Sequence, residues 1–258
     1  MKKVIFLTND DGIHAVGLSA LEEQLKNRDI PFFTAAPLYE MSGSGHSITL
    51  DKPLKAKKFK ENRYGVTGTP ADSVFLGLRL LLKEKPAFAV SGINRGANLG
   101  NDVSYSGTVS AAVETFYHGV TSFAVSLHIS ERENFNDSLF QDSAHILFDI
   151  VIPEIEQKLG EELYLKPHLF NINIPDTVFK KGICEIEWTF PGKRLYSEDI
   201  IKRVDPRGAE YYWIGGSLHM FEDIKGSDCN AIKNGFISVS PMKISFSDSL
   251  LLDKLNNN

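Results

Sequence analysis

Residues 4–25 read VIFLTNDDGIHAVGLSALEEQL, and this stretch decides the fold. It opens with an apolar run from Val4 to Leu7, continues through a polar turn, and then places Leu18, Leu21 and Leu25 at helical spacing. The stretch therefore predicts a buried strand, a loop and an amphipathic helix. A second strand, expected over residues 31–36, completes a βαβ unit, whose strands run parallel and are buried on both faces.

The alternation of strand and helix continues to about residue 175. Further strands are expected over residues 87–91, 123–127 and 169–174, and a short hairpin over 48–58. Thr69, Pro70 and Asp72 have the pattern of a helix N-terminus. Other helices are expected from Ser106 to Gly119 and over 138–159, the latter interrupted near Pro153. This order predicts an α/β fold with a Rossmann-like, doubly wound and mostly parallel sheet.

The pattern changes after about residue 180. Segments rich in β-forming residues follow at 184–190, 210–214 and 235–239, separated by turns. We therefore expect two parts, a Rossmann-like catalytic core over residues 1–180 and a β-rich C-terminal extension over 181–258 that is an appendage to the core. The aromatic run Tyr211, Tyr212 and Trp213 is more than a small appendage can bury, which favours a role in oligomer formation.

Composition and charge restrict the partners. The 258 residues carry a net charge of −5, and Lys and Arg are scattered, which argues against polymeric nucleic acid. The apolar run near the start ends after Leu7, too early for the core of a signal peptide. No apolar stretch approaches the roughly 18 residues of a membrane span. Cytoplasmic residence without a membrane partner is the expectation.

The loop after the first strand holds two adjacent carboxylates. Asn9-Asp10-Asp11-Gly12 follows directly on the buried run. Neighbouring carboxylates repel each other, so a cation or strong donors between them would explain the pair. An Asx-type turn closed by Gly12 would explain the same residues without any ligand.

Two further loops should share a rim with this one, because ligands of open α/β sheets bind beyond the carboxyl ends of the strands. The stretch 42–47, SGSGHS, consists largely of small residues that let backbone N–H groups approach an anion, although a plain flexible loop looks the same. The third loop follows the strand at 87–91, runs from Gly92 to Tyr105 and leads into Ser106-Gly107-Thr108, which begin a helix and suit either a phosphate or an ordinary N-cap. Together the loops favour a divalent metal with oxygen ligands beside an anion cradle, the equipment for metal-assisted phosphate hydrolysis.

These motifs resemble a known family. The stretches TNDDGI (8–13), GHSIT (45–49), GTPADSV (68–74), SGIN (91–94) and YSGTVSAA (105–112) look like successive motifs of the SurE (survival protein) family, and DPRG (205–208) and GFISVSP (235–241) are similar to its C-terminal region. The resemblance spans nearly the whole chain. It implies a 5′/3′-nucleotidase that hydrolyses nucleoside monophosphates with one divalent metal ion, Mg²⁺ or Mn²⁺, as a homodimer or homotetramer.

The resemblance also implies roles for particular residues. Asp10, Asp11, Ser42 and Asn94 would bind the metal, which would polarise a phosphate oxygen and activate water. Ser106, Gly107 and Thr108 would lie on the phosphate side. His46 is a candidate for protonating the leaving alcohol, although a single loop histidine is more often structural.

Two alternatives remain open. An aspartyl-phosphate phosphatase would use a D-x-D arrangement after the first strand, but Asn9 precedes Asp11 by two positions and Gly12 follows Asp10 by two. A non-catalytic, oligomeric nucleotide-binding protein would use the same loops to hold an anion without hydrolysing it.

Overall fold

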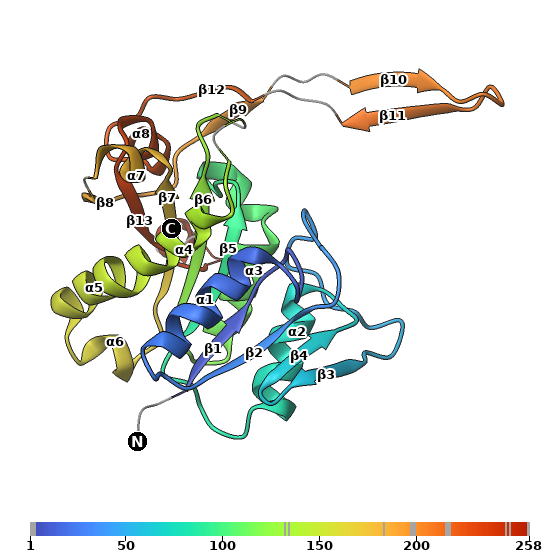
Figure 1. Cartoon of the computed structure of the whole chain (residues 1–258). Coiled ribbons are helices and arrows are strands. Elements are labelled where there is room, and N and C mark those ends of the chain that lie inside the picture. Colours follow the sequence, from blue (N-terminus) through green and yellow to red (C-terminus); the bar gives the residue numbers. More distant parts are fainter. Residues whose placement is uncertain are drawn as a thin grey trace.

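In the part of the chain that the structure describes, one mixed sheet of nine strands forms the centre (Figure 1). The computed structural model describes residues 4–256, except 132, 134, 183, 197–199, 215–217, 246 and 248. In spatial order the strands are β3 (Ala56–Lys60), β4 (Arg63–Val66), β2 (Phe32–Pro37), β1 (Ile5–Thr8), β5 (Ala89–Arg95), β6 (Ser122–His128), β7 (Leu169–Pro175), β13 (Ile237–Pro241) and β8 (Ile186–Trp188). The neighbours from β4 to β7 pair in parallel. The predicted α/β class with a mostly parallel sheet is confirmed.

Helices cover both faces of this sheet. They are α1 (Val16–Asn27), α2 (Pro70–Leu76), α3 (Gly107–Tyr117), α4 (Ser138–Ile146), α5 (Ile152–Leu159), α6 (Glu162–Leu165), α7 (Thr177–Lys181), α8 (Asp228–Asn234) and α9 (Ser249–Asn256). Successive residues of β1 point to opposite faces. Ile5 and Leu7 pack in one apolar cluster with residues of α1, α4 and α5, whereas Phe6 packs with residues of α2 and α3 in another.

The helix N-terminus predicted at Thr69 is confirmed. The Thr69 Oγ1 accepts a hydrogen bond of 3.1 Å from the Asp72 backbone N–H, and the Asp72 carboxylate accepts one of 2.9 Å from the Thr69 N–H. Asp72 also accepts hydrogen bonds from the backbone and hydroxyl of Thr49. This buried carboxylate therefore ties the loop after β2 to the start of α2.

The predicted hairpin exists, but eight residues later than expected. Residues 48–55 form no strand, and the hairpin consists of β3 and β4 instead. Its turn contains Asn62 at φ 57°, a left-handed conformation that asparagine tolerates better than most residues. The Asn62 turn, rather than the apolar residues near Ile48, sets the position of the hairpin.

The long helix predicted over 138–159 is continuous through Pro153. The irregular segment precedes Pro153: it is a π-helical turn, η4 (Leu147–Val151), between α4 and α5. Proline has no N–H for the ordinary helical hydrogen bond, and the changed register before it accommodates this loss. Pro153 is the second residue of α5 and directly follows this turn.

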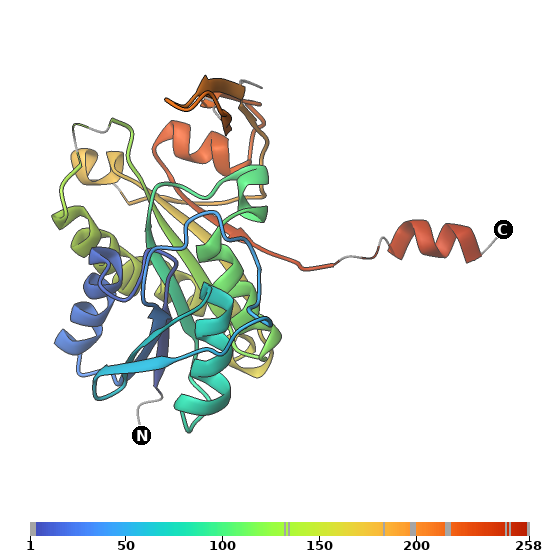
Figure 2. The same cartoon turned by 90° about the vertical axis from the view of Figure 1, so that its right-hand side faces the viewer.

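The C-terminal part contributes to the sheet as well as projecting from it. β13 pairs antiparallel with β7 and parallel with β8, so the sheet continues past residue 180. Two small antiparallel pairs lie outside it: β9 (Arg194–Tyr196) with β12 (Leu218–Phe221), and β10 (Ile200–Val204) with β11 (Glu210–Ile214). The β10–β11 pair extends away from the body in Figure 1, and α9 does so in Figure 2. None of the described helices has both the length and the apolar composition needed to cross a membrane.

Candidate functional site

A cleft of about 600 Å³ opens beyond the carboxyl ends of the central strands. β1 lies between β2 and β5, so the loops that follow these three strands meet at one rim, as the sequence predicts. The residues lining the cleft are Asp10, Ser42, Gly43, Asn94, Arg95, Asn98, Asn101, Asp102, Tyr105 and Ser106. Four of the predicted site residues, Asp10, Ser42, Asn94 and Ser106, are therefore brought together.

Asp10 lines the cleft but is almost completely buried. Only 4% of it is exposed, and burial raises the pKa of its carboxyl group. The Thr108 hydroxyl donates a hydrogen bond of 2.5 Å to Asp10 Oδ1, and the Thr108 backbone N–H also donates to this carboxylate. A side chain at Gly107 would place its Cβ 2.7 Å from the Asp10 Cβ. Gly107 and Thr108, expected on the phosphate side, thus hold Asp10 in place.

Asp11 carries an unfavourable charge in this site. Burial, and then the neighbouring charge of Asp10, raise its pKa to about 6. A hydrogen bond involving the Arg95 backbone and the Arg95 charge oppose this rise. A cation between the two carboxylates would relieve both the burial cost and the repulsion, so the pair fits a divalent metal.

The turn that follows β1 is made by Asn9 and not by the aspartates. The Asn9 side-chain Nδ2 donates to the Gly12 carbonyl at 2.9 Å, and its Oδ1 accepts from the Gly12 N–H at 3.2 Å. Gly12 has φ +98°, and a Cβ there would come within 3.1 Å of the Tyr39 backbone. The Asx-type turn of the simpler interpretation is therefore present, but it leaves the carboxylates of Asp10 and Asp11 without a turn-forming role.

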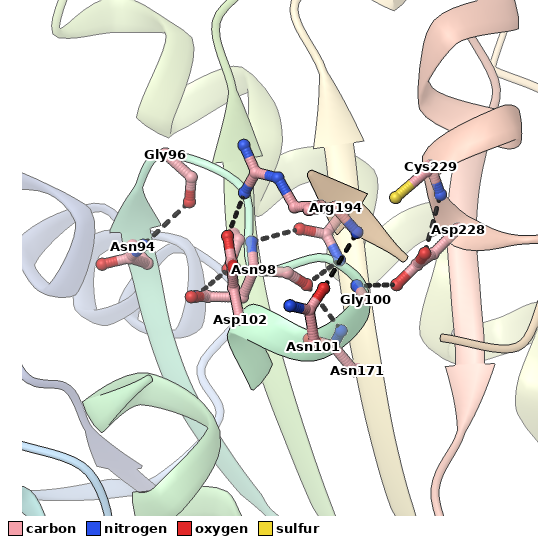
Figure 3. A network of polar contacts seen from close by, with 12 residues as sticks. Asn94, Gly96, Asn98, Gly100, Asn101, Asp102, Asn171, Arg194, Asp228 and Cys229 are labelled. Atoms are coloured by element: carbon pink, nitrogen blue, oxygen red, sulfur yellow. Dashed lines mark hydrogen bonds and ion pairs between the residues drawn. The ribbon is translucent and has the colours of Figure 1, made fainter. Parts of the chain in front are cut away.

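Ser42 and Asn94 present neutral oxygens near the carboxylate pair. The Ser42 hydroxyl donates to Glu40 Oε1 at 2.9 Å, which leaves the hydroxyl oxygen as an acceptor. Asn94 Nδ2 donates to the Gly96 carbonyl at 2.8 Å, as Figure 3 shows, so the amide nitrogen is occupied and the amide oxygen remains for a ligand. Both side chains are suitable oxygen ligands for Mg²⁺ or Mn²⁺.

Ser106 both caps α3 and lines the cleft. Its Oγ accepts a hydrogen bond of 3.1 Å from the Val109 N–H, as an ordinary N-cap does. It also lines the cleft, where the positive end of the α3 dipole favours an anion. The N-cap interpretation and the anion interpretation are compatible at this residue.

His46 does not line the cleft. Its Nε2 lies 2.8 Å from Glu114 Oε2, and its ring stacks on Tyr117 with 5.9 Å between the ring centroids. The hydrogen bond from His46 is the main reason that the pKa of Glu114 is lowered. These contacts favour a structural role, in which His46 fastens the loop after β2 to α3.

A buried asparagine network supports the loop that follows β5 (Figure 3). Its residues were not among the site residues predicted from the sequence. The Asn98 N–H donates to Asn173 Oδ1, its Nδ2 donates to Ser126 Oγ, and its carbonyl accepts from the side chains of Asn171 and Asn173. Asn171 and Asn173 are fully buried in β7. The sequence did contain a signal for this network. Asn171 and Asn173 stand in a stretch predicted to be a buried strand, where polar side chains need hydrogen-bond partners.

The donors present define the kind of metal that the site suits. Among the described residues, no group of three or more His, Cys, Asp or Glu side chains could hold a metal ion. A metal in this cleft would depend on two carboxylates and neutral oxygens, which suits a hard divalent ion rather than zinc.

Fold and cleft together define the class: a Rossmann-like α/β protein with an acidic, oxygen-lined site beyond the carboxyl ends of its central strands. The comparisons with known proteins agree. Residues 5–198 match the family model described as survival protein SurE. A protein named 5′-nucleotidase SurE from Caldanaerobacter subterraneus is 38% identical over 99% of this chain and 97% of that protein, and one from Geotalea daltonii is 44% identical over 93% and 92%.

A solved structure shows the same fold. The SurE protein from Aquifex aeolicus superposes with a TM-score of 0.80 at 37% identity and covers 98% of each chain. The chain belongs to the SurE family.

Proposed function

We propose that this protein is a divalent-metal-dependent phosphomonoesterase that hydrolyses nucleoside 5′- and 3′-monophosphates to nucleoside and phosphate. The observation that carries the proposal is the cleft lined by Asp10, Ser42, Asn94 and Ser106, next to which the adjacent carboxylate of Asp11 has a pKa raised by burial and by the Asp10 charge. Asp11 itself is not among the lining residues. Relatives named 5′-nucleotidase SurE, similar over nearly the whole chain, support the hydrolysis of 5′-monophosphates.

The metal would be held by Asp10, Asp11, Ser42 and Asn94. When bound, a divalent ion supplies charge that polarises a phosphate oxygen and makes a water molecule a better nucleophile. Thr108 and Gly107 fix the position of the Asp10 carboxylate through contact from α3. Ser106 and the α3 N-terminus meet the negative charge of the phosphate group. His46 is bound to Glu114, so its participation as a proton donor would require that contact to break.

The first experiment measures hydrolysis of a panel of nucleoside 5′- and 3′-monophosphates with Mg²⁺, with Mn²⁺, and after exhaustive chelation. We expect activity with either ion and a loss of more than about 100-fold after chelation, because the two carboxylates repel an unneutralised phosphate. Full activity in the chelated protein would refute the metal dependence. Absence of hydrolysis with every substrate would favour the non-catalytic nucleotide-binding alternative.

A second experiment separates attack by water from a phosphoaspartate route. Position 9 carries an amide rather than a carboxylate, and this amide is engaged in the turn with Gly12, so the D-x-D pair of a phosphoaspartate route is missing. Direct attack by water should invert the configuration at phosphorus in a chiral thiophosphate substrate, whereas two successive displacements should retain it. Retention would favour the aspartyl-phosphate alternative.

We also propose that the protein forms a homodimer or homotetramer through the extension over residues 181–258. The support comes from the exposed apolar side chains of the β10–β11 pair, which include Ile200 at 67% and Trp213 at 64% exposure.

A further inference from the structure

Asp102 is a carboxylate in the cleft that the proposed reaction does not use. It lies in the 3₁₀ turn η2 (Gly100–Ser104) and lines the same cleft as Asp10. Besides Asp10 and Asp102, the lining residues include one basic side chain, Arg95. An incoming phosphate group would meet Asp102 as a repulsive charge unless that charge were balanced.

Arg194 supplies this balance from outside the cleft. Its Nη1 lies 2.6 Å from Asp102 Oδ2, and the two side chains are only 15% and 21% exposed. The Arg194 backbone N–H also donates a hydrogen bond of 2.8 Å to Asn101 Oδ1, so two consecutive residues of η2 are held (Figure 3). Arg194 belongs to β9, at the base of the β10–β11 pair, and is not among the residues lining the cleft.

The approach of β9 to η2 is fixed by a buried carboxylate in α8. Asp228 is fully buried, and its two oxygens accept from the Gly100 N–H at 2.8 Å and the Gly192 N–H at 2.7 Å. The two backbones come so close that a Cβ on Gly100 would lie 2.7 Å from the Gly192 carbonyl oxygen. Arg194 is thus presented to Asp102 by a rigid support rather than by a loose surface loop.

We propose that Arg194 is a positioning residue for phosphate binding, because it neutralises Asp102 and holds its carboxylate aside from the incoming phosphate. The proposal rests on the proposed function, since it takes the anion in the cleft to be a phosphate ester. In this way a residue of the C-terminal part of the chain would change the electrostatic potential in the cleft.

The test combines Arg194→Met, Asp102→Asn and the double variant, each with saturating Mg²⁺. Inorganic phosphate is titrated by calorimetry, and KM and kcat are measured for AMP. Arg194→Met should raise the Kd for phosphate and the KM roughly tenfold, with a smaller change in kcat, as expected for one unbalanced charge in a partly exposed cleft. In the Asp102→Asn background, adding Arg194→Met should change the Kd by less than about twofold, because no charge remains to be balanced.

Two controls separate this effect from a general loss of structure. Lys193→Met removes the neighbouring ion pair with Glu222, which is 2.7 Å long and exposed. Neither side chain is among the cleft-lining residues, so this variant should bind phosphate like the wild type. Arg194→Lys keeps the charge and should recover most of the affinity. Should Arg194→Met fail to fold, the double variant, which has no unpaired carboxylate, is compared directly with Asp102→Asn.

Phosphate affinity that is unchanged in Arg194→Met, or a loss that persists equally in the Asp102→Asn background, would overturn the inference. Wild-type protein that neither hydrolyses AMP nor binds phosphate would instead refute the proposed function. The two failures are therefore distinguishable.

Discussion

At the scale of single residues, the carboxylate pair stores an unfavourable interaction that a ligand can relieve. Asp10 is buried and Asp11 is largely buried, and both have raised pKa values. A raised pKa means that the folded protein favours the protonated carboxyl group. The ionised form of Asp11 therefore costs stability, and this cost grows as the pH rises from the ordinary value of 3.8 to about 6, then stays constant.

Asp11→Asn should therefore stabilise the metal-free protein while removing most of its activity. At pH 8 in chelator, we expect the melting temperature of the variant to exceed that of the wild type by about 3 °C or more. The difference should shrink as the pH falls below about 6, because wild-type Asp11 then becomes protonated. Differential scanning calorimetry across this pH range measures it.

Asp142→Asn, on an exposed position of α4, is the matched control and should not change the melting temperature. An Asp11→Asn variant that is less stable than the wild type at pH 8 would contradict the unfavourable charge of Asp11, and one with unchanged turnover would contradict its role in the proposed reaction.

At the scale of elements, the start of α3 is the part of the fold that fixes the site. Thr108 is fully buried and directs both its hydroxyl and its backbone N–H at Asp10. Gly107 allows this approach because a Cβ would collide with the Asp10 side chain. Helix α3 thus acts on the carboxylate as an outer layer of the proposed metal site.

Thr108→Val should lower turnover by roughly 10- to 100-fold, the usual cost of removing a hydrogen-bonding partner of a metal ligand. Thr115→Val is a matched control in the same helix, because Thr115 is also fully buried and, among the residues that the structure describes, its hydroxyl bonds to the Ala111 carbonyl alone. Steady-state kinetics at several metal concentrations would show whether the loss of turnover in Thr108→Val reflects weaker metal binding, because higher metal concentration would then restore turnover. Equal losses in the two variants would contradict a specific role for Thr108.

The elements that the sequence predicts well are those with a strong periodic pattern. The apolar run before Asp10, the leucine spacing of α1 and the cap at Thr69 each specify their element locally. The alternation of strand and helix predicts a parallel sheet, although not the order of its strands. The shared rim of the three loops follows from that topology. The metal ligand set came from the family resemblance and stays a prediction.

Other features depend on tertiary contacts that no local pattern carries. The burial of Asp10 depends on α3, which begins almost a hundred residues later in the chain. The pairing of Arg194 with Asp102 and the two hydrogen bonds of Asp228 likewise join distant segments. The position of the hairpin depended on a turn residue, Asn62, whose conformation outweighed the apolar pattern before it.

At the scale of the whole molecule, the β10–β11 pair projects with its apolar side chains in solvent. Replacing residues 200–214 with a short Gly-Ser linker should convert the proposed oligomer to a smaller species, as measured by light scattering. The deletion removes the apolar surface that the proposal takes to be buried against another copy. A truncation at Cys184 would be a poorer test, since it would also remove β8 and β13 from the central sheet.

The hairpin deletion leaves the sheet intact, so its melting temperature serves as the control for folding. A full-length protein that is monomeric at micromolar concentration would count against the proposed role of the β10–β11 pair in oligomer formation.

The position of β13 also constrains how the protein is made. This strand covers the open edge of β7, yet it lies about sixty residues later in the chain, after the whole of the projecting segment. During synthesis, β7 leaves the ribosome well before its antiparallel neighbour exists, and its unpaired edge is available to other chains for that interval. The final closure of the sheet is therefore a late, long-range event. A chain interrupted shortly before residue 237 should be prone to aggregate even though the loops that line the cleft are already complete.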